Sequence, residues 1–195
     1  MRTYEPFRYT LYVDTVKESL EELRNCDDYA ESTHQKDRGD TRLGEPNFKV
    51  LDSLPYTKKL LEGYIHKAFH SNYRYTNDFR ITTSWITNNR LGDTIRHHHH
   101  MNCWYSGVLY HGDYDDTSGS LVFKNPICDQ ATFDLDSDPN PMKDSIAIPP
   151  RKNLLILFPS CITHYCYEIN RSRISLAFNI LPTGTMGQSD STCTL

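Results

Sequence analysis

Long hydrophobic runs are missing from this sequence of 195 residues. The longest clear one is Leu154 to Phe158, whereas a membrane-spanning helix needs roughly 20 apolar residues. The segment Met1 to Pro6 also lacks the apolar core of a secretory signal. We therefore expect a cytoplasmic protein without a membrane partner.

An excess of positive charge is equally absent. The chain has 21 Lys and Arg residues against 25 Asp and Glu residues, a net charge of −4, so we expect no nucleic-acid partner. None of the cysteines forms a CxxC pair, which argues against a zinc ribbon. We expect reduced, mostly buried thiols that are not metal ligands; they are Cys26, Cys103, Cys128, Cys161, Cys166 and Cys193.

Helical and strand patterns occupy different halves of the chain. A strand is predicted at 7–13, and a short helix with a capping-box pattern begins near Thr15. A polar loop follows at 27–47, and a second helix runs over about 53–69 with one apolar face. From Phe79 onward branched and aromatic runs predict strands, with a turn at 88–93. Further strands are predicted at 104–110, 119–123, 153–158 and 173–180.

This order predicts an α+β fold that is mainly β, a barrel or sandwich with two N-terminal helices packed on the outside. We expect one domain over 1–195. Its barrel core covers about 79–182, a strand-helix-loop-helix segment covers 7–70, and a flexible tail covers 183–195.

The most unusual stretch is the run of four histidines at 97–100, in the middle of the chain. Side chains two apart share one face of a strand, so two imidazoles of this run can converge on one metal ion. A third ligand must come from elsewhere. His164, which follows the apolar strand at 153–158, is the candidate.

The last predicted strand, 173–180, is amphipathic. Its apolar face would pack on the scaffold, whereas the other face presents Arg173, Ser175, Ala177 and Asn179. An arginine and a hydroxyl two residues apart can hold one carboxylate, the arginine through a forked, charge-assisted pair. From the pattern alone, a solvent-facing polar side remains an equal alternative.

The order of these motifs resembles the iron(II)- and 2-oxoglutarate-dependent oxygenase superfamily. The motifs are an HxH pair, SGVLY at 106–110, GSLVF at 119–123, FPS at 158–160, His164, and RxSLAFN at 173–179. Together they are similar to the prolyl-hydroxylase-like branch found in bacteria and their phages, over about 79–182. A phage-encoded protein would work in the host cytoplasm.

The resemblance implies a double-stranded β-helix, which is the jelly-roll or cupin-like barrel, with iron at its mouth. Alignment on the SG pair of SGVLY selects His98, His100 and His164 as metal ligands, with no catalytic side chain beyond them. Arg173, Ser175 and Tyr110 would bind the distal carboxylate of 2-oxoglutarate. Asn179 is a further candidate for contact with the cosubstrate or with water.

The same resemblance implies the chemistry. Fe(II), 2-oxoglutarate and O2 would serve a hydroxylase that releases succinate and CO2. The substrate would be a protein, with a prolyl residue as its target, or a small molecule. Loops around a rigid barrel commonly carry specificity, so we expect substrate contacts from 27–47 and 124–148.

One departure from the family pattern keeps alternatives open. Most members have His-x-Asp/Glu, whereas here the second position is His100, which leaves the iron site one charge unit more positive. Three-histidine iron sites also occur in thiol dioxygenases, which do not use 2-oxoglutarate, and a non-catalytic binding barrel is the third possibility. His111 and Asp113 form a literal HxD, but they follow the SGVLY strand, where the family has a turn.

Overall fold

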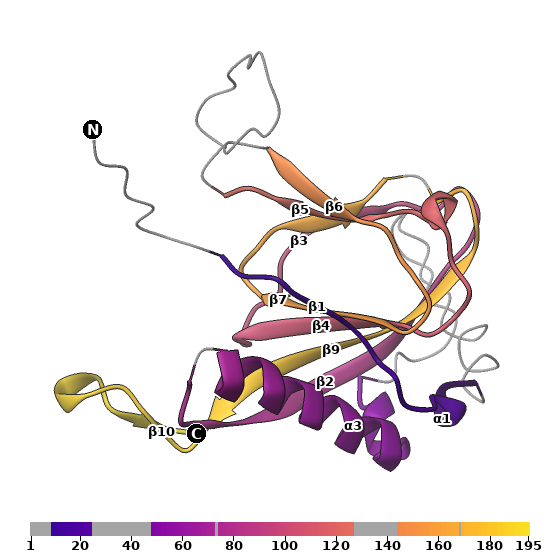
Figure 1. Cartoon of the computed structure of the whole chain (residues 1–195). Helices are drawn as coiled ribbons and strands as arrows, with labels where there is room; N and C mark the ends of the chain where they lie inside the picture. Colours follow the sequence, from indigo (N-terminus) through magenta and orange to yellow (C-terminus); the bar gives the residue numbers. More distant parts are fainter. Residues whose placement is uncertain (1–8, 25–47, 73, 127–143, 168) are drawn as a thin grey trace.

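The computed structural model describes residues 9–24, 48–72, 74–126, 144–167 and 169–195. Two antiparallel sheets face each other around one barrel, and helix α3 covers the outside of the larger sheet (Figure 1). This is the double-stranded β-helix that the sequence predicts, so the predicted fold class is confirmed.

The larger sheet has the strand order β1-β7-β4-β9-β2. Its central strand β4 is buried at every position, because one face meets the helices and the other meets the smaller sheet. Side chains therefore alternate between an outer and an inner core. The strands are β1 (Tyr12–Thr15), β7 (Leu154–Pro159), β4 (Tyr105–Tyr110), β9 (Arg173–Thr183) and β2 (Asp78–Asn89).

The smaller sheet has the strand order β3-β8-β5-β6. Its strands are short and closed over the inner core; they are β3 (Ile95–His98), β8 (His164–Cys166), β5 (Leu121–Lys124) and β6 (Ser145–Ile148). In the β3–β8 pair His98 lies directly opposite His164, after an irregularity that begins at Ile95. This pairing positions one end of the histidine run.

The helical segments lie on the outside of the larger sheet. They are α1 (Glu21–Arg24), the 3-10 turn η1 (Val50–Ser53), α3 (Pro55–His66) and the π-helical turn η2 (Lys67–Asn72). Pro55 starts α3, where its missing N–H costs no helical hydrogen bond. The helix predicted at 53–69 is thus confirmed, although it consists of two helix types.

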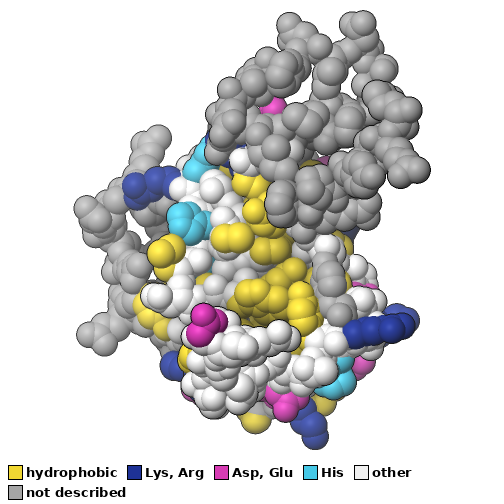
Figure 2. All heavy atoms as spheres, turned by 90° about the vertical axis from the view of Figure 1, so that its left-hand side faces the viewer, with side chains coloured by type: hydrophobic (Ala, Val, Ile, Leu, Met, Phe, Trp, Pro, Cys, Tyr) yellow, Lys and Arg dark blue, Asp and Glu magenta, His cyan; other side chains and the backbone are white. Residues whose placement is uncertain are grey.

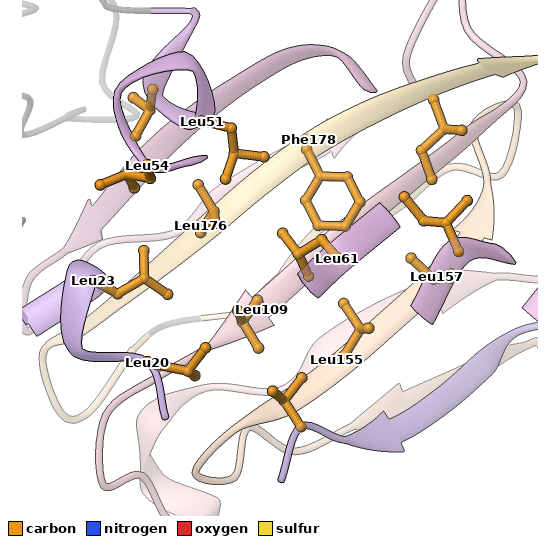
Figure 3. Packing of buried hydrophobic residues seen from close by; sticks show 14 of the residues in the cluster. Leu20, Leu23, Leu51, Leu54, Leu61, Leu109, Leu155, Leu157, Leu176 and Phe178 are labelled. Atoms are coloured by element: carbon orange, nitrogen blue, oxygen red, sulfur yellow. The ribbon is translucent and has the colours of Figure 1, made fainter. Parts of the chain in front are cut away.

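The outer core is rich in leucine. Each fully buried leucine contributes roughly 1.5–3 kcal/mol by leaving water, so this layer fixes the sheet against the helices. Figure 3 shows its side chains pointing toward one another; they include Leu20, Leu23, Leu51, Leu54, Leu61, Leu109, Leu155, Leu157, Leu176 and Phe178.

Four predictions need correction. The short helix begins at Glu21 rather than near Thr15, which is the last residue of β1. Asn88 and Asn89 belong to strand β2 rather than to a turn, because they pair with Ile174 and Arg173 of β9. Within the described residues the first strand begins at Tyr12 and continues to Thr15, two residues past the predicted end at 13, because it pairs with β7 there. Of the four cysteines in the described part of the chain, only Cys166 is buried; Cys161 and Cys193 are exposed.

Two shorter regions complete the described chain. The predicted flexible tail contains a hairpin of β10 (Thr185–Met186) and β11 (Cys193–Thr194), with η5 (Ser189–Ser191) between them. The turn η3 (Asp116–Ser118) links β4 to β5 and is closed by an Asp115 capping box. None of the helices in these described ranges is long and apolar enough to cross a bilayer.

Candidate functional site

His98, His100 and His164 converge at one end of the barrel. One ring nitrogen from each lies within 4.8 Å of the others, and within the described residues this is the only group of three metal-capable side chains. The ring centroids of His98 and His164 are 4.2 Å apart, and that of His100 is 5.3 and 5.0 Å from them. Three imidazoles at this spacing can bind one transition-metal ion.

The hydrogen bonds at Nδ1 decide which nitrogen each ring offers. His98 Nδ1 lies 2.7 Å from the carbonyl oxygen of Arg96, and His164 Nδ1 lies 3.0 Å from that of Ile162. A carbonyl oxygen only accepts, so each Nδ1 carries the proton and each Nε2 keeps a lone pair. Backbone oxygens that hold a ring in this way are typical of metal-binding histidines.

His100 is held by side chains of the larger sheet. Its Nδ1 lies 2.7 Å from Asn179 Oδ1 and 3.0 Å from Ser106 Oγ. Ser106 Oγ also bonds to Asn179 Oδ1 at 2.8 Å and to Ser160 Oγ at 2.8 Å. Because the Asn179 oxygen accepts the Nδ1 proton, the Nε2 lone pair of His100 also remains available.

The backbone of the histidine run changes direction between His98 and His100. Strand β3 ends at His98, and the N–H of His100 then donates to the carbonyl of Ser160. The connections 99–104 and 160–163 therefore lie together at the left-hand end of the barrel in Figure 1. The two ligands come from a strand end and a loop, not from one face of a continuous strand.

Burial favours the neutral form of two of the three rings, His100 and His164. Burial, reinforced by the nearby His98, lowers the pKa of His164 to about 3. Burial also lowers the pKa of His100, against the opposing hydrogen bond to Asn179. Neutral imidazole is the form that binds metal, so at neutral pH these two rings need lose no proton to do so.

One cavity of about 420 Å³ joins the histidines to the polar side of β9. It lies between the two sheets, and its walls include all three histidines together with Tyr110, Arg173 and Ser175. The polar face of β9 is therefore internal, which excludes the alternative of a solvent-facing strand. Cavities of this size are typical of small-molecule sites.

Arg173 is buried at the far end of β9 from Asn179, with only 2% of its surface exposed. Its Nη1 donates to the carbonyl of Gly119 and to Tyr110 Oη at 3.4 Å, and its Nη2 contacts Cys166 Sγ at 2.8 Å. Its Nε has no partner, and no acidic side chain of the described residues pairs with it. A buried cation without a counter-charge is costly, so this cavity is suited to an anion.

Tyr110 supports the same end of the cavity. Burial raises the pKa of Tyr110 to about 12, so its phenol keeps its proton. The Arg173 guanidinium lies 5.3 Å from the centre of its ring, and Ser175 is directly opposite Tyr110 in the β4–β9 pair. A guanidinium and two hydroxyls thus line one wall.

The other predicted site residues lie elsewhere. Asn179 contacts His100 instead of the Arg173 end of the cavity. His111 and Asp113 do not join the histidine cluster; Asp113 is exposed and pairs with Lys152 at 2.9 Å. The predicted substrate loops, 27–47 and most of 124–148, fall outside the described residues.

Three supporting residues were not predicted. Ser106 could have been suspected, because it is a polar residue in an otherwise apolar buried strand. Gly119 acts through its carbonyl and Cys166 through a contact that only the fold creates. No sequence pattern signals either one.

Comparison with known proteins agrees with this geometry. The family described as "Putative 2OG-Fe(II) oxygenase" matches residues 83–179, about half of the chain. The matched segment begins in β2 and ends in β9, and it contains all three histidines, Tyr110, Arg173 and Ser175. No curated protein matches the sequence at a significant level.

Solved structures share the fold at low sequence identity. A prolyl-4-hydroxylase from Pseudomonas putida has a TM-score of 0.55 and 13% identity, over 89% of this chain and 87% of that one. A 2OG-Fe(II) oxygenase family oxidoreductase from Burkholderia pseudomallei has a TM-score of 0.57 and 14% identity, over 88% of this chain and 84% of that one. HygX from Streptomyces hygroscopicus was solved with nickel, 2-oxoglutarate and hygromycin B bound. It has a TM-score of 0.56 and 13% identity, over 89% of this chain and 83% of that one.

The barrel and its matched segment define an oxygenase of the double-stranded β-helix class. The chain belongs to the iron(II)- and 2-oxoglutarate-dependent oxygenase superfamily and is similar to its prolyl-hydroxylase-like members. The predicted enzyme class, an Fe(II)/2-oxoglutarate dioxygenase, is confirmed. Its predicted cofactors, Fe(II), 2-oxoglutarate and O2, are those of the family.

Proposed function

We propose that this chain hydroxylates a substrate at an Fe(II) held by His98, His100 and His164, with 2-oxoglutarate as cosubstrate. The observation that carries this proposal is the shared cavity. It has three converging imidazoles in one part and a buried arginine without an acidic partner among the described residues in another. A dicarboxylate with a 2-oxo acid at one end satisfies both parts at once.

The residues that line the cavity fall into a metal-binding group and a carboxylate-binding group. The three Nε2 atoms hold the metal, and Arg173, Ser175 and Tyr110 bind the distal carboxylate. Tyr110 keeps its proton and can donate it, whereas Arg173 supplies the charge. When bound, Fe(II) supplies the redox chemistry that couples O2 and 2-oxoglutarate to substrate hydroxylation, with succinate and CO2 as co-products.

His100 acts in this proposal as a ligand in its own right. Its ring is oriented by Asn179 and Ser106, and its remaining nitrogen faces the other two histidines. Asp113, the carboxylate of the HxD alternative, pairs with Lys152 in the exposed loop after β4. A neutral triad leaves the Fe(II) site more positive than a His-His-carboxylate triad would.

A prolyl residue of a protein is the substrate class that we propose. Similarity to the Pseudomonas putida prolyl-4-hydroxylase motivates this choice. Figure 2 views the barrel from the end where the histidines lie and shows hydrophobic side chains gathered in the middle of this face, with histidine side chains near its edge. Such a surface suits an apolar group such as a prolyl ring.

The test is spectroscopic and needs no substrate. Anaerobic addition of Fe(II) and 2-oxoglutarate should give a visible charge-transfer band, and admission of O2 should then release succinate slowly. His98→Ala and His164→Ala should abolish both signals. His99→Ala is the matched control, because His99 is exposed and lies outside the ligand cluster.

Other outcomes identify the alternatives. Oxygen consumption with a thiol that ignores 2-oxoglutarate would identify a three-histidine thiol dioxygenase. Absence of tight Fe(II) binding would identify a non-catalytic barrel. Either result overturns the proposed function.

A further inference from the structure

Asn89, like Arg173, lines the cavity and has a buried polar atom without a hydrogen bond. It is the last residue of β2, only 2% of its surface is exposed, and it lines the same cavity as Arg173. Its Oδ1 is buried and accepts no hydrogen bond, and no described residue bonds to its side chain. A buried amide without a hydrogen bond costs free energy, so a ligand that supplies one is favoured.

The position of Asn89 is fixed by strand pairing. It lies directly opposite Arg173 in the antiparallel β2–β9 pair. Directly opposite residues project from the same face, with Cβ atoms about 5 Å apart. Arg173 Nε also has no partner among the described residues. Two side chains that lie opposite each other on neighbouring strands, each with an unpaired polar atom, therefore line the same cavity.

We infer that Asn89 is a specificity-determining residue that binds the distal carboxylate of 2-oxoglutarate together with Arg173. This inference rests on the proposed function. A half-turn of the amide exchanges its oxygen and nitrogen, so Asn89 can present an N–H donor to a carboxylate oxygen. A carboxylate with several acceptor sites satisfies Asn89 and Arg173 Nε at once.

The amide has an advantage over an acid at this position. A carboxylate at residue 89 would pair with Arg173 itself and leave the cavity without its positive charge. Asn89 keeps that charge available for the ligand and adds a donor. The site therefore recognises a dianionic 2-oxo acid better than one that ends in a methyl group.

The experiment measures dissociation constants with Mn(II)-loaded, full-length protein under anaerobic conditions. Asn89→Ala should raise the dissociation constant for 2-oxoglutarate by about 10- to 100-fold, the effect of losing one charge-assisted hydrogen bond. Its affinity for 2-oxopentanoate, in which a methyl group replaces the distal carboxylate, should stay unchanged. Asn89→Asp should raise the dissociation constant for 2-oxoglutarate above that of Asn89→Ala. It should also reduce the preference for 2-oxoglutarate over 2-oxopentanoate.

Asn88→Ala is the matched control. Asn88 is the preceding residue of β2, is also buried, and points away from the cavity, because neighbouring strand residues alternate. It should bind 2-oxoglutarate like the wild type. Mn(II) affinity should be the same in all variants, which separates a cosubstrate effect from a damaged metal site.

The outcomes separate this inference from the proposed function. If the wild type binds 2-oxoglutarate and Asn89→Ala binds it equally well, the inference is overturned and the proposed function stands. An equal loss of 2-oxopentanoate affinity in Asn89→Ala would also overturn it, since that pattern indicates general damage. A wild type that does not bind 2-oxoglutarate overturns both.

Discussion

At the residue scale, the chemistry of the histidine run depends on oxygen atoms supplied by other segments. Arg96 and Ile162 lie two residues before His98 and His164 and accept from them through backbone carbonyls. His100 instead relies on Asn179, which is 79 positions away. Two of the proposed ligands are thus oriented locally and the third by the tertiary fold.

Unlike the two backbone carbonyls, the Asn179 acceptor is a side-chain atom that one substitution removes. Asn179→Ala removes the acceptor that fixes the His100 ring, and loss of such a partner typically costs about 10- to 100-fold in metal affinity. Competition with a metal-chelating dye measures the change. Asn170→Ala serves as control, because Asn170 is exposed and its backbone N–H donates to Thr117, outside the histidine cluster. Equal metal affinity in both variants would contradict this role.

Gly119 provides a second prediction for single residues. Its φ is +78°, and an added Cβ would lie 2.8 Å from Ile169 Cγ1, so Gly119→Ala should cost about 1–3 kcal/mol in the free energy of unfolding. Its carbonyl accepts from Arg173, so 2-oxoglutarate affinity should also fall. Urea denaturation and ligand titration measure the two effects.

Gly92→Ala is the control that separates the loss of stability from the loss of 2-oxoglutarate affinity. Its φ is +84°, but an added Cβ there meets no atom within 4 Å, so Gly92→Ala carries only the backbone cost. It should lose stability and keep 2-oxoglutarate affinity. If Gly119→Ala kept its affinity as well, the Gly119 carbonyl would not position Arg173.

At the scale of elements, strand β4 is packed tightly at Gly107, against the side chains of the outer core. A Cβ on Gly107 would lie 2.3 Å from Phe178 Cζ and 2.9 Å from Leu157 Cδ2. Gly107→Ala should therefore destabilise the protein by about 1–3 kcal/mol through overpacking. Gly63→Ala in α3 is the contrast, since nothing lies within 4 Å and alanine favours helix by about 0.5–1 kcal/mol. In thermal denaturation, the Tm of Gly107→Ala should fall and that of Gly63→Ala should rise.

The elements also show how far the sequence alone could be interpreted. Alternation along 173–180 predicted β9 correctly, because one face is apolar and packs in the outer core. Asn88 and Asn89 resemble a turn locally, but pairing with β9 overrides that preference. The order of motifs identified the candidate ligands and Arg173. The contacts of Asn179, Gly119 and Cys166 depend on register and packing, which no local pattern encodes.

At the scale of the whole molecule, ligand binding should raise thermal stability in a defined order. A metal ion at 100 times its dissociation constant adds about 2.7 kcal/mol. That gain corresponds to a rise in Tm of about 5–10 °C for a chain of this size. 2-Oxoglutarate should add a further rise only when metal is present, because part of its binding is to the metal. Differential scanning fluorimetry measures both steps.

Two variants separate the steps. His164→Ala should lose both rises, and Arg173→Ala should keep the metal rise and lose the second one. If 2-oxoglutarate raised the Tm equally with and without metal, the cosubstrate would not bind at the histidine triad.

The hydrogen bond between His100 and Asn179 has a consequence for folding kinetics. Its two partners lie on either side of most of the barrel in sequence, so it can form only after β4 and β9 have paired. The same holds for the triad, which needs β3 beside β8. We therefore predict that the proposed metal site is assembled late, after the transition state for folding. A bound ion should leave the refolding rate nearly unchanged and act almost entirely by slowing unfolding.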